Sequence, residues 1–212
     1  MSKLQGYFIS FEGGDGSGKT TQSRLLQKYL KDKLNIEACW TREPGGSNIG
    51  NDVRELLAKY TQELDGYSTL LLLMASRRQH INKLIIPNIA KGNWVICDRF
   101  IDSTLAYQNV LDGISYDFII KAHKEFAIDY WPYLTFFLDI TPEIASMRMS
   151  QRSKDDYYDN LDMNKKTNLR ESFLQIAKIY PERIHIIDGS KSEQDIHIDI
   201  VNIINKKLLN ND

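Results

Sequence analysis

Features that would tie this chain to a membrane or to nucleic acid are scarce in the sequence. Its longest uncharged apolar run, LLLLMA at 70–75, is far too short to cross a bilayer, and no long apolar stretch occupies the N-terminus. Lys and Arg (27) nearly balance Asp and Glu (28), and the formal net charge of -1 gives no long-range attraction to nucleic acid. We therefore expect a cytoplasmic protein with neither membrane nor nucleic-acid partners.

Cysteine and histidine are too sparse to suggest a disulfide framework or a metal centre. The two cysteines, Cys39 and Cys97, form no C-x-x-C motif and show no Cys/His ligand spacing. Each ends an apolar run typical of a buried strand, so we expect buried free thiols rather than a disulfide or a metal site. The four histidines also lack ligand spacing, and we expect them to be structural or exposed to solvent. They are His80, His123, His185 and His197.

The sequence does contain a regular alternation of short apolar runs with longer helical patterns. This alternation predicts βαβ units around a parallel sheet, and runs that are apolar throughout are typical of strands covered on both faces. The length of 212 residues, without repeats or linkers, indicates one domain over 1–212. The predicted strands are 7–12, 37–41, 94–98, 134–139 and 184–188. Helices are predicted at 19–33, 50–59 and 68–91, with a kink at Pro87 in the third.

The stretch from Gly13 to Thr20 matches the phosphate-loop pattern G-x-x-x-x-G-K-[ST]. It follows a predicted strand and precedes a predicted helix, which is the context in which the pattern binds a triphosphate. Lys19 would contact the β- and γ-phosphates and Thr20 would hold Mg²⁺; the alternative is a glycine-rich turn with a chance Lys-Thr pair. No [NT]-K-x-D guanine motif occurs, which disfavours a GTPase switch. The predicted ATP-binding residues are Gly13, Gly14, Asp15, Gly16, Ser17, Gly18, Lys19, Thr20 and Thr21.

Arginines at several positions favour a second phosphate site. A kinase whose acceptor is itself a phosphate must bring two polyanions together, and arginines suit that task. Asp98 ends a predicted strand, where a carboxylate can reach Mg²⁺ through water; a strand-capping role is the alternative. The arginines are Arg42 in TREPGG, Arg54 in VREL, Arg77 and Arg78 in ASRRQH, and Arg99 in CDRF. The alternatives are a surface ion pair with a neighbour for Arg42, a surface position for Arg54 and a solvated helix face for Arg78.

Taken in order, these motifs resemble the thymidylate kinase family of the bacterial type. FEGGDGSGKTTQ is followed by TREPGGS, ASRRQH and CDRFIDSTLAYQ, and the resemblance extends from Phe8 to about Asp188. It implies an α/β P-loop nucleoside monophosphate kinase fold, with helices flanking a five-stranded parallel sheet and a mobile lid. It also implies a homodimer that transfers the γ-phosphate of ATP to dTMP, giving dTDP and ADP for dTTP synthesis, with Mg²⁺ as cofactor.

The resemblance implies roles for individual residues as well. Asp15 would bind the deoxyribose 3′-hydroxyl, Arg99 the dTMP phosphate and Arg77 the thymine edge. The other dTMP assignments are Arg42, Glu43 and Arg54 around the acceptor phosphate and metal, Leu73, Thr104 and Gln108 at the base, and Tyr107 beside the sugar. The predicted metal surroundings are thus Thr20, Asp98 and Glu43.

Two positions depart from the family pattern. Leu73 stands one helical turn before Arg77, where relatives carry a phenylalanine, and it loses aromatic stacking worth roughly 0.5–1.5 kcal/mol. Gly16 stands where some relatives carry a catalytic arginine inside the phosphate loop. The missing cation must then come from elsewhere. The polar segment at about 148–167 is either a solvated loop or, as the resemblance implies, a lid that supplies it.

Within this segment we predict Arg152 as the closing cation and Arg148 as its support, with Lys154 nearby. An Asp-Arg pair common in relatives is Asp159-Asn160 here. The predicted catalytic residues are Lys19, Arg99, Arg152, Arg148 and Asp15. Two alternative functions remain: a kinase of another nucleoside monophosphate, which Leu73 leaves open, and a P-loop regulatory protein that binds nucleotide without transferring phosphate.

Overall fold

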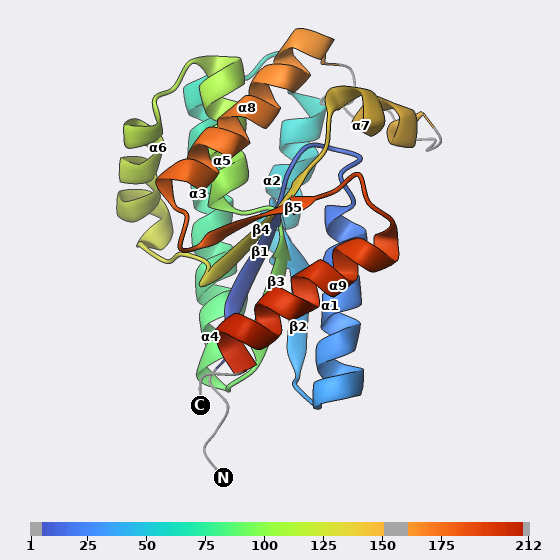
Figure 1. Cartoon of the computed structure of the whole chain (residues 1–212). Helices are drawn as coiled ribbons and strands as arrows, with labels where there is room; N and C mark the ends of the chain where they lie inside the picture. Colours follow the sequence, from blue (N-terminus) through green and yellow to red (C-terminus); the bar gives the residue numbers. More distant parts are fainter. Residues whose placement is uncertain (1–5, 151–160, 210–212) are drawn as a thin grey trace.

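A five-stranded parallel β-sheet forms the centre of the computed structural model, which describes residues 6–150 and 161–209 (Figure 1). The strand order is β2-β3-β1-β4-β5, and every neighbouring pair runs parallel. The strands are β1 (Phe8–Glu12), β2 (Ala38–Arg42), β3 (Trp94–Asp98), β4 (Leu134–Asp139) and β5 (Ile184–Asp188). The predicted sheet is therefore confirmed, and each strand begins and ends within one residue of its predicted position.

Helices cover both faces of this sheet. In Figure 1, α1 and α9 lie together against one face, while α3, α5 and α8 lie on the other. The α-helices are α1 (Lys19–Leu34), α2 (Asn48–Lys59), α3 (Gly66–His80), α4 (Ile86–Ala90), α5 (Ile101–Asp112), α6 (Tyr116–Ala122), α7 (Pro142–Met149), α8 (Met163–Ile179) and α9 (Glu193–Ile204). Within the described ranges, π-helical segments accompany them at η1 (Ile81–Ile85), η2 (His123–Ile128) and η4 (Asn205–Leu209).

Alternate side chains of each strand contribute to two separate cores. Ile9 and Phe11 of β1 pack in the core that α1 and α9 cover, whereas Phe8 packs in the core beneath α3, α5 and α8. Burial on both faces explains why the strand sequences are nearly continuous apolar runs. Both thiols are free. Cys97 is buried as expected, whereas Cys39, on the edge strand β2, is only half-buried.

The long helical stretch predicted at 68–91 is three consecutive helical segments. It begins at α3, where the Asp65 side chain caps the helix by accepting hydrogen bonds from the amides of Tyr67 and Ser68. The regular pattern gives way to π-helix at Ile81–Ile85 and then resumes as α4, with Pro87 in its first turn. Proline has no amide hydrogen to donate to the preceding turn, which accounts for an interruption at this place.

The ends of the predicted lid segment are helical. Residues 148 and 149 belong to α7, and residues 163–167 form the first turn of α8. Residues 151–160, which include Arg152, Lys154 and the Asp159-Asn160 pair, lie outside the described residues. The lid itself therefore stays a prediction.

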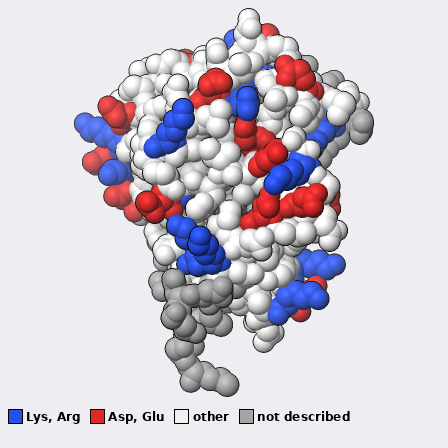
Figure 2. Space-filling model, viewed as in Figure 1, with Lys and Arg blue, Asp and Glu red and all other residues white. Residues whose placement is uncertain are grey.

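The described surface carries charges of both signs. On the face shown in Figure 2, basic and acidic side chains are interspersed rather than gathered into one large basic region. This distribution agrees with the net charge of -1. Among the described helices, none has the length and apolar character needed to span a membrane.

Candidate active site

The phosphate loop connects β1 to α1 at the C-terminal edge of the sheet, where ligands bind in open α/β folds. Gly13, Gly16 and Gly18 all have positive φ angles (136°, 78° and 94°), which L side chains rarely adopt. A Cβ atom on Gly16 would lie 2.8 Å from the carbonyl oxygen of Ala145 on α7. The close packing of α7 thus explains why a loop arginine could not be accommodated at position 16.

Lys19 and Thr20 begin α1, and their side chains contact the phosphate loop and the end of β3, respectively. Lys19 Nζ donates to the Gly14 carbonyl at 2.7 Å, and burial lowers its pKa to about 8, with Arg99 acting in the same direction. Thr20 Oγ1 donates to Asp98 Oδ2 at 2.5 Å. Thr20 and Asp98 are 78 positions apart in the sequence. They meet because β1, which leads into the phosphate loop, pairs with β3 in a register that sets Phe11 beside Asp98.

The hydroxyl of Thr20 and the carboxylate of Asp98 fit the needs of Mg²⁺. This ion prefers hard oxygen ligands and is usually held by one or two protein groups together with waters and substrate phosphates. No cluster of three or more His, Cys, Asp or Glu side chains that could hold a metal by itself occurs among the described residues. One hydroxyl and one carboxylate suit a metal that arrives with a nucleotide.

Arg99 and Asp15 form the central ion pair of the site. Arg99 Nη2 lies 2.6 Å from Asp15 Oδ1, and the same guanidinium contacts the Gly13 carbonyl and the Ser103 hydroxyl, both at 3.2 Å. Burial alone would raise the pKa of Asp15, but Arg99 and Lys19 outweigh it and lower the pKa to about 2. Asp15 is thus a carboxylate at neutral pH, fixed beside two cations.

Glu12 supports the backbone that carries Arg99. Arg99 has a positive φ of 69°, and the next amide, Phe100 N, donates to Glu12 Oε1 at 2.7 Å. Glu12 Oε2 accepts from the Ser103 hydroxyl at 2.5 Å. Burial, assisted by the charge of Asp102, raises the pKa of Glu12 to about 8. The sequence alone did not assign Glu12 this role.

One cavity between the loop after β2, α2, α3 and α5 collects all of the predicted dTMP residues. Arg77 is almost completely buried at 2% exposure, Arg42 is exposed, and Arg54 and Leu73 are half-buried. The predicted residues that line the cavity are Asp15, Arg42, Glu43, Arg54, Leu73, Arg77, Arg99, Thr104, Tyr107 and Gln108. Lining residues that sequence reasoning missed are Pro44, Leu57, Ala58, Thr61, Thr69, Phe100 and Ser103. Arg78, by contrast, is exposed and does not line this cavity.

Glu43 holds Arg77 rather than facing the phosphate loop. Its Oε2 accepts from Arg77 Nε at 2.8 Å, and its Oε1 lies 2.8 Å from His80 Nδ1. Burial opposes ionisation of Glu43, but Arg77 and His80 together hold its pKa below the usual value. Because both carboxylate oxygens are used in this way, the geometry does not support the predicted place of Glu43 among the metal surroundings.

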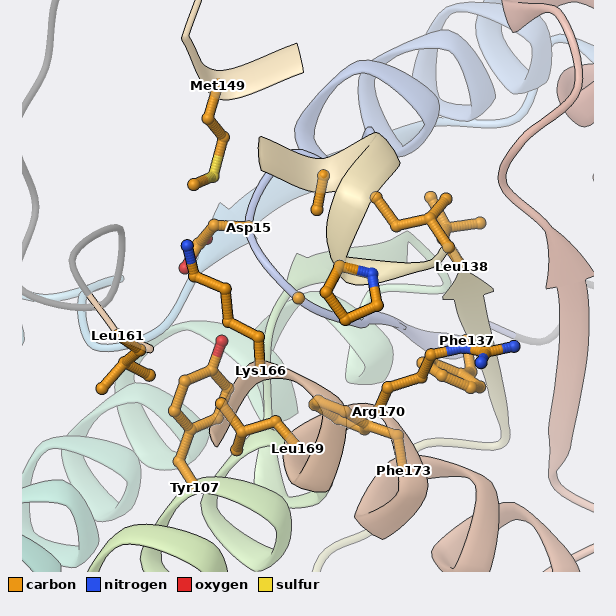
Figure 3. Close-up of a pocket in the computed structure, with 14 residues that line it drawn as sticks. Asp15, Tyr107, Phe137, Leu138, Met149, Leu161, Lys166, Leu169, Arg170 and Phe173 are labelled. Carbon is orange, nitrogen blue, oxygen red and sulfur yellow. The ribbon is translucent and has the colours of Figure 1, made fainter. Parts of the chain in front are cut away.

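A second cavity, shown in Figure 3, adjoins the first at Asp15 and Tyr107. Its walls come from the phosphate loop, the end of β4, α7 and α8, and Lys166 of α8 points toward Asp15 (Figure 3). Arg170 lines the same cavity while forming a bidentate ion pair with Asp139, at 2.6 and 2.8 Å. Arg148 lies near this region, but its Nη1 donates to the Gly189 carbonyl after β5 at 2.9 Å.

Comparison with known proteins identifies the same family at the level of sequence and fold. The sequence model of the family described as Thymidylate kinase matches residues 11–200. Thymidylate kinase of Orientia tsutsugamushi (strain Ikeda) is 39% identical over 209 residues, covering 96% of this chain and 94% of that protein. Thymidylate kinase of Clostridium novyi (strain NT) is 44% identical over 193 residues, covering 88% and 92%. The crystal structure of thymidylate kinase from Ehrlichia chaffeensis matches with a TM-score of 0.75 and 38% identity, covering 94% of this chain and 98% of that one.

These matches extend over nearly the whole chain, whereas the phosphate loop alone is common to many nucleotide kinases. The resemblance drawn from the motifs and the P-loop nucleoside monophosphate kinase fold are both confirmed. From its sequence, its fold and the arrangement of its site, the chain belongs to the thymidylate kinase family.

Proposed function

We propose that this chain transfers the γ-phosphate of ATP to dTMP, giving dTDP and ADP in dTTP synthesis. The observation that supports it best is the cavity lined by all ten predicted dTMP residues, which meets the phosphate loop at Asp15 and Arg99. A cavity lined by several arginines beside a phosphate loop suits a phosphate acceptor. A P-loop regulatory protein would not require this second site.

In the proposed reaction, an oxygen of the dTMP phosphate attacks the γ-phosphorus of ATP. The bond from the γ-phosphorus to the bridging oxygen breaks, and ADP leaves with that electron pair. The acceptor is already an oxyanion at neutral pH, so no general base is needed, and catalysis consists of positioning and charge neutralisation. Lys19 and the loop amides would hold the ATP phosphates, while Arg99 would hold the acceptor phosphate.

Mg²⁺ is proposed as the cofactor, with Thr20 and Asp98 as the residues that would hold it. When bound, it would neutralise charge on the nucleotide phosphates. Asp98 would act through water, because its Oδ2 already accepts a hydrogen bond from the Thr20 hydroxyl. Glu43 is left out of this assignment, since Arg77 and His80 use both of its oxygens.

Of the two predicted lid cations, Arg148 lies within the described residues and Arg152 does not. The contact of Arg148 with the Gly189 carbonyl ties its side chain to the loop after β5. Arg148 would therefore shape the ATP side of the site rather than support the transferred phosphate. Arg152 lies outside the described residues, and its role as the closing cation stays a prediction.

We also propose a single domain, a cytoplasmic location and a homodimer. Four large apolar side chains on α3, α6 and η2 are between 46% and 57% exposed; we call them the apolar face. They are Tyr67, Leu71, Phe118 and Phe126. Tyr67 and Phe118 meet edge to face with ring centroids 5.5 Å apart, and Leu71 lies one helical turn after Tyr67. Covering this face with a second copy of the chain would remove it from water.

The function is tested by measuring ADP release in Mg-ATP with dTMP, dUMP, dCMP, dGMP and AMP. We expect kcat/KM to be highest for dTMP by about tenfold or more, equivalent to about 1.4 kcal/mol of transition-state discrimination. Another nucleotide that matched dTMP would favour the alternative of a different nucleoside monophosphate kinase, which Leu73 leaves open. No acceptor-dependent ADP release would favour a nucleotide-binding regulatory protein.

A further inference from the structure

His80 occupies a buried position behind the wall of the dTMP cavity. It ends α3, and its side chain is fully enclosed, at 0% exposure. His80 Nε2 lies 2.8 Å from Thr41 Oγ1 at the end of β2, and Nδ1 lies 2.8 Å from Glu43 Oε1. A Cβ atom on Gly46 would lie only 2.1 Å from His80 Cδ2, so the loop after β2 packs closely against the imidazole ring. His80 therefore connects α3 to β2 and to that loop.

Glu43 extends this connection to Arg77. The carboxylate accepts from His80 through one oxygen and from Arg77 Nε through the other, while Arg77 Nη2 donates to Thr104 Oγ1 at 2.8 Å. Because an ionised carboxylate can only accept, the proton between Glu43 and His80 is carried by Nδ1. The guanidinium of Arg77 is thus fixed from two sides, by Glu43 and by Thr104.

The orientation of Arg77 matters for the choice of base. A guanidinium only donates hydrogen bonds, so it matches a ring carbonyl, as in thymine, and mismatches the exocyclic amino group of cytosine at the same position. Such discrimination requires that the guanidinium keeps one orientation. A guanidinium that could turn away would no longer be held against the amino group of cytosine. Glu43 can hold Arg77 in one orientation only while its own second oxygen has a donor.

We infer that His80 is a positioning residue for base recognition: by holding Glu43, it orients Arg77 so that the site prefers a pyrimidine with a carbonyl over one with an amino group. This role rests on the proposed function, in which Arg77 contacts the base. His80 itself does not line the cavity. Its effect must therefore pass through Glu43 and Arg77.

The test compares three substitutions of His80 by their kcat/KM for dTMP and dCMP. His80→Leu removes both polar contacts. His80→Asn places an amide nitrogen near the position of Nδ1 and keeps a donor for Glu43, whereas His80→Gln extends its amide toward the Nε2 position and Thr41. We expect His80→Leu to reduce the dTMP/dCMP ratio by about tenfold, mainly through a higher KM for dTMP with an unchanged KM for ATP. We expect His80→Asn to retain more of the ratio than His80→Gln.

His123→Leu is the matched control, because His123 is equally buried but hydrogen-bonds to the Tyr130 carbonyl rather than to Glu43 or Arg77. We expect it to lower thermal stability without changing the dTMP/dCMP ratio. If a folded His80→Leu variant keeps the wild-type dTMP/dCMP ratio, the inference about His80 is overturned while the proposed function stands. If His80→Leu does not fold, equal ratios for His80→Asn and His80→Gln would overturn it. A wild-type enzyme without preference for dTMP over dCMP would overturn both the inference and the proposed base contact of Arg77.

Discussion

Arg99 Nη2 lies 2.6 Å from Asp15 Oδ1, and this pair joins the phosphate loop to the turn that follows β3. The two residues are 84 positions apart, and both line the dTMP cavity. The pair holds an arginine where the acceptor phosphate would bind and a carboxylate where the sugar would lie. It therefore places both ends of the proposed acceptor relative to the ATP site.

Substitution of Asp15 by asparagine should reduce selectivity for the sugar 3′-hydroxyl. A hydrogen bond to a charged group contributes about 1.5–3 kcal/mol, so wild-type enzyme should prefer dTMP over its 3′-deoxy analogue by about tenfold or more. In Asp15→Asn this preference should shrink, because the amide is neutral and the Arg99 ion pair is lost. The measurement is kcat/KM for both acceptors. Asp52→Asn, at an exposed position of α2, is the control, and an unchanged preference in Asp15→Asn would contradict the assignment.

ATP binding should be accompanied by proton uptake near pH 8. The pKa of Lys19 in the free protein is lowered to about 8 by burial, so at that pH about half of the molecules carry a neutral amine. The triphosphate favours the ammonium form and should raise this pKa, drawing a proton from solvent. Calorimetry in buffers of different ionisation enthalpy measures the uptake, and affinity should fall as pH rises above about 8. A Lys19→Arg variant that still binds ATP should show no uptake; equal uptake in this variant would exclude Lys19 as its source.

Replacing Leu73 by phenylalanine should tighten dTMP binding. An aromatic ring that stacks on the base adds about 0.5–1.5 kcal/mol, which corresponds to a decrease in KM of roughly 2- to 12-fold. Leu73 lines the dTMP cavity in a half-buried position, so the added ring would enter the cavity. The KM for ATP should not change, and Ile198→Phe on the exposed surface of α9 should affect neither constant. A higher KM for dTMP would show that the cavity lacks room for the ring.

A charge on the apolar face should dissociate the proposed homodimer. Leu71 is 55% exposed in the centre of α3, and a glutamate there would have to be buried between two copies of the chain. Sedimentation velocity should show a species of twice the chain mass for the wild type and a monomer for Leu71→Glu. Ile198→Glu, on α9, should remain dimeric. A wild-type chain that sediments only as a monomer at assay concentration would contradict the dimer.

Removing Arg183 should destabilise the fold strongly. Its guanidinium forms two hydrogen bonds of 2.7 Å to Asp102 and a third to Thr135 Oγ1, and Asp102 is only 1% exposed. Loss of one partner of a buried ion pair leaves an uncompensated charge and costs about 3–5 kcal/mol. Urea unfolding should report this loss for Arg183→Leu. The exposed pair Lys191–Asp199 offers a contrast, since solvent screens it and Lys191→Leu should leave the urea midpoint nearly unchanged.

An Asp102→Asn/Arg183→Leu double variant should recover part of the lost stability, because the uncompensated carboxylate is then absent. If Arg183→Leu unfolds at the same urea concentration as the wild type, the Arg183–Asp102 pair does not contribute to the stability of the fold.

Most of the fold and of the phosphate-binding sites could be predicted from local sequence. A parallel sheet covered on both faces requires apolar strands. Apolar runs separated by helical patterns therefore located both ends of every strand to within one residue. The phosphate loop is equally local, because its glycines, Lys19 and Thr20 are consecutive and their geometry depends on the backbone between a strand and a helix. The dTMP residues came from the resemblance, and the cavity brings all ten together.

Only the tertiary structure determined how these residues act on one another. The carboxylate of Glu43 is a group that can bind a metal. In the fold, however, both of its oxygens contact side chains of α3, namely Arg77 and His80. His80 ends the ASRRQH motif but received no role from the sequence. Its connection to the cavity arises because β2 and α3 pack together, although Thr41 and His80 are 39 positions apart. Sequence alone determined which chemical groups are available and which segments carry them, because backbone conformation and amphipathic pattern are local. The contact partners and the burial of each side chain depend on long-range packing that no single segment encodes. The charge state and the role of the side chain follow from them.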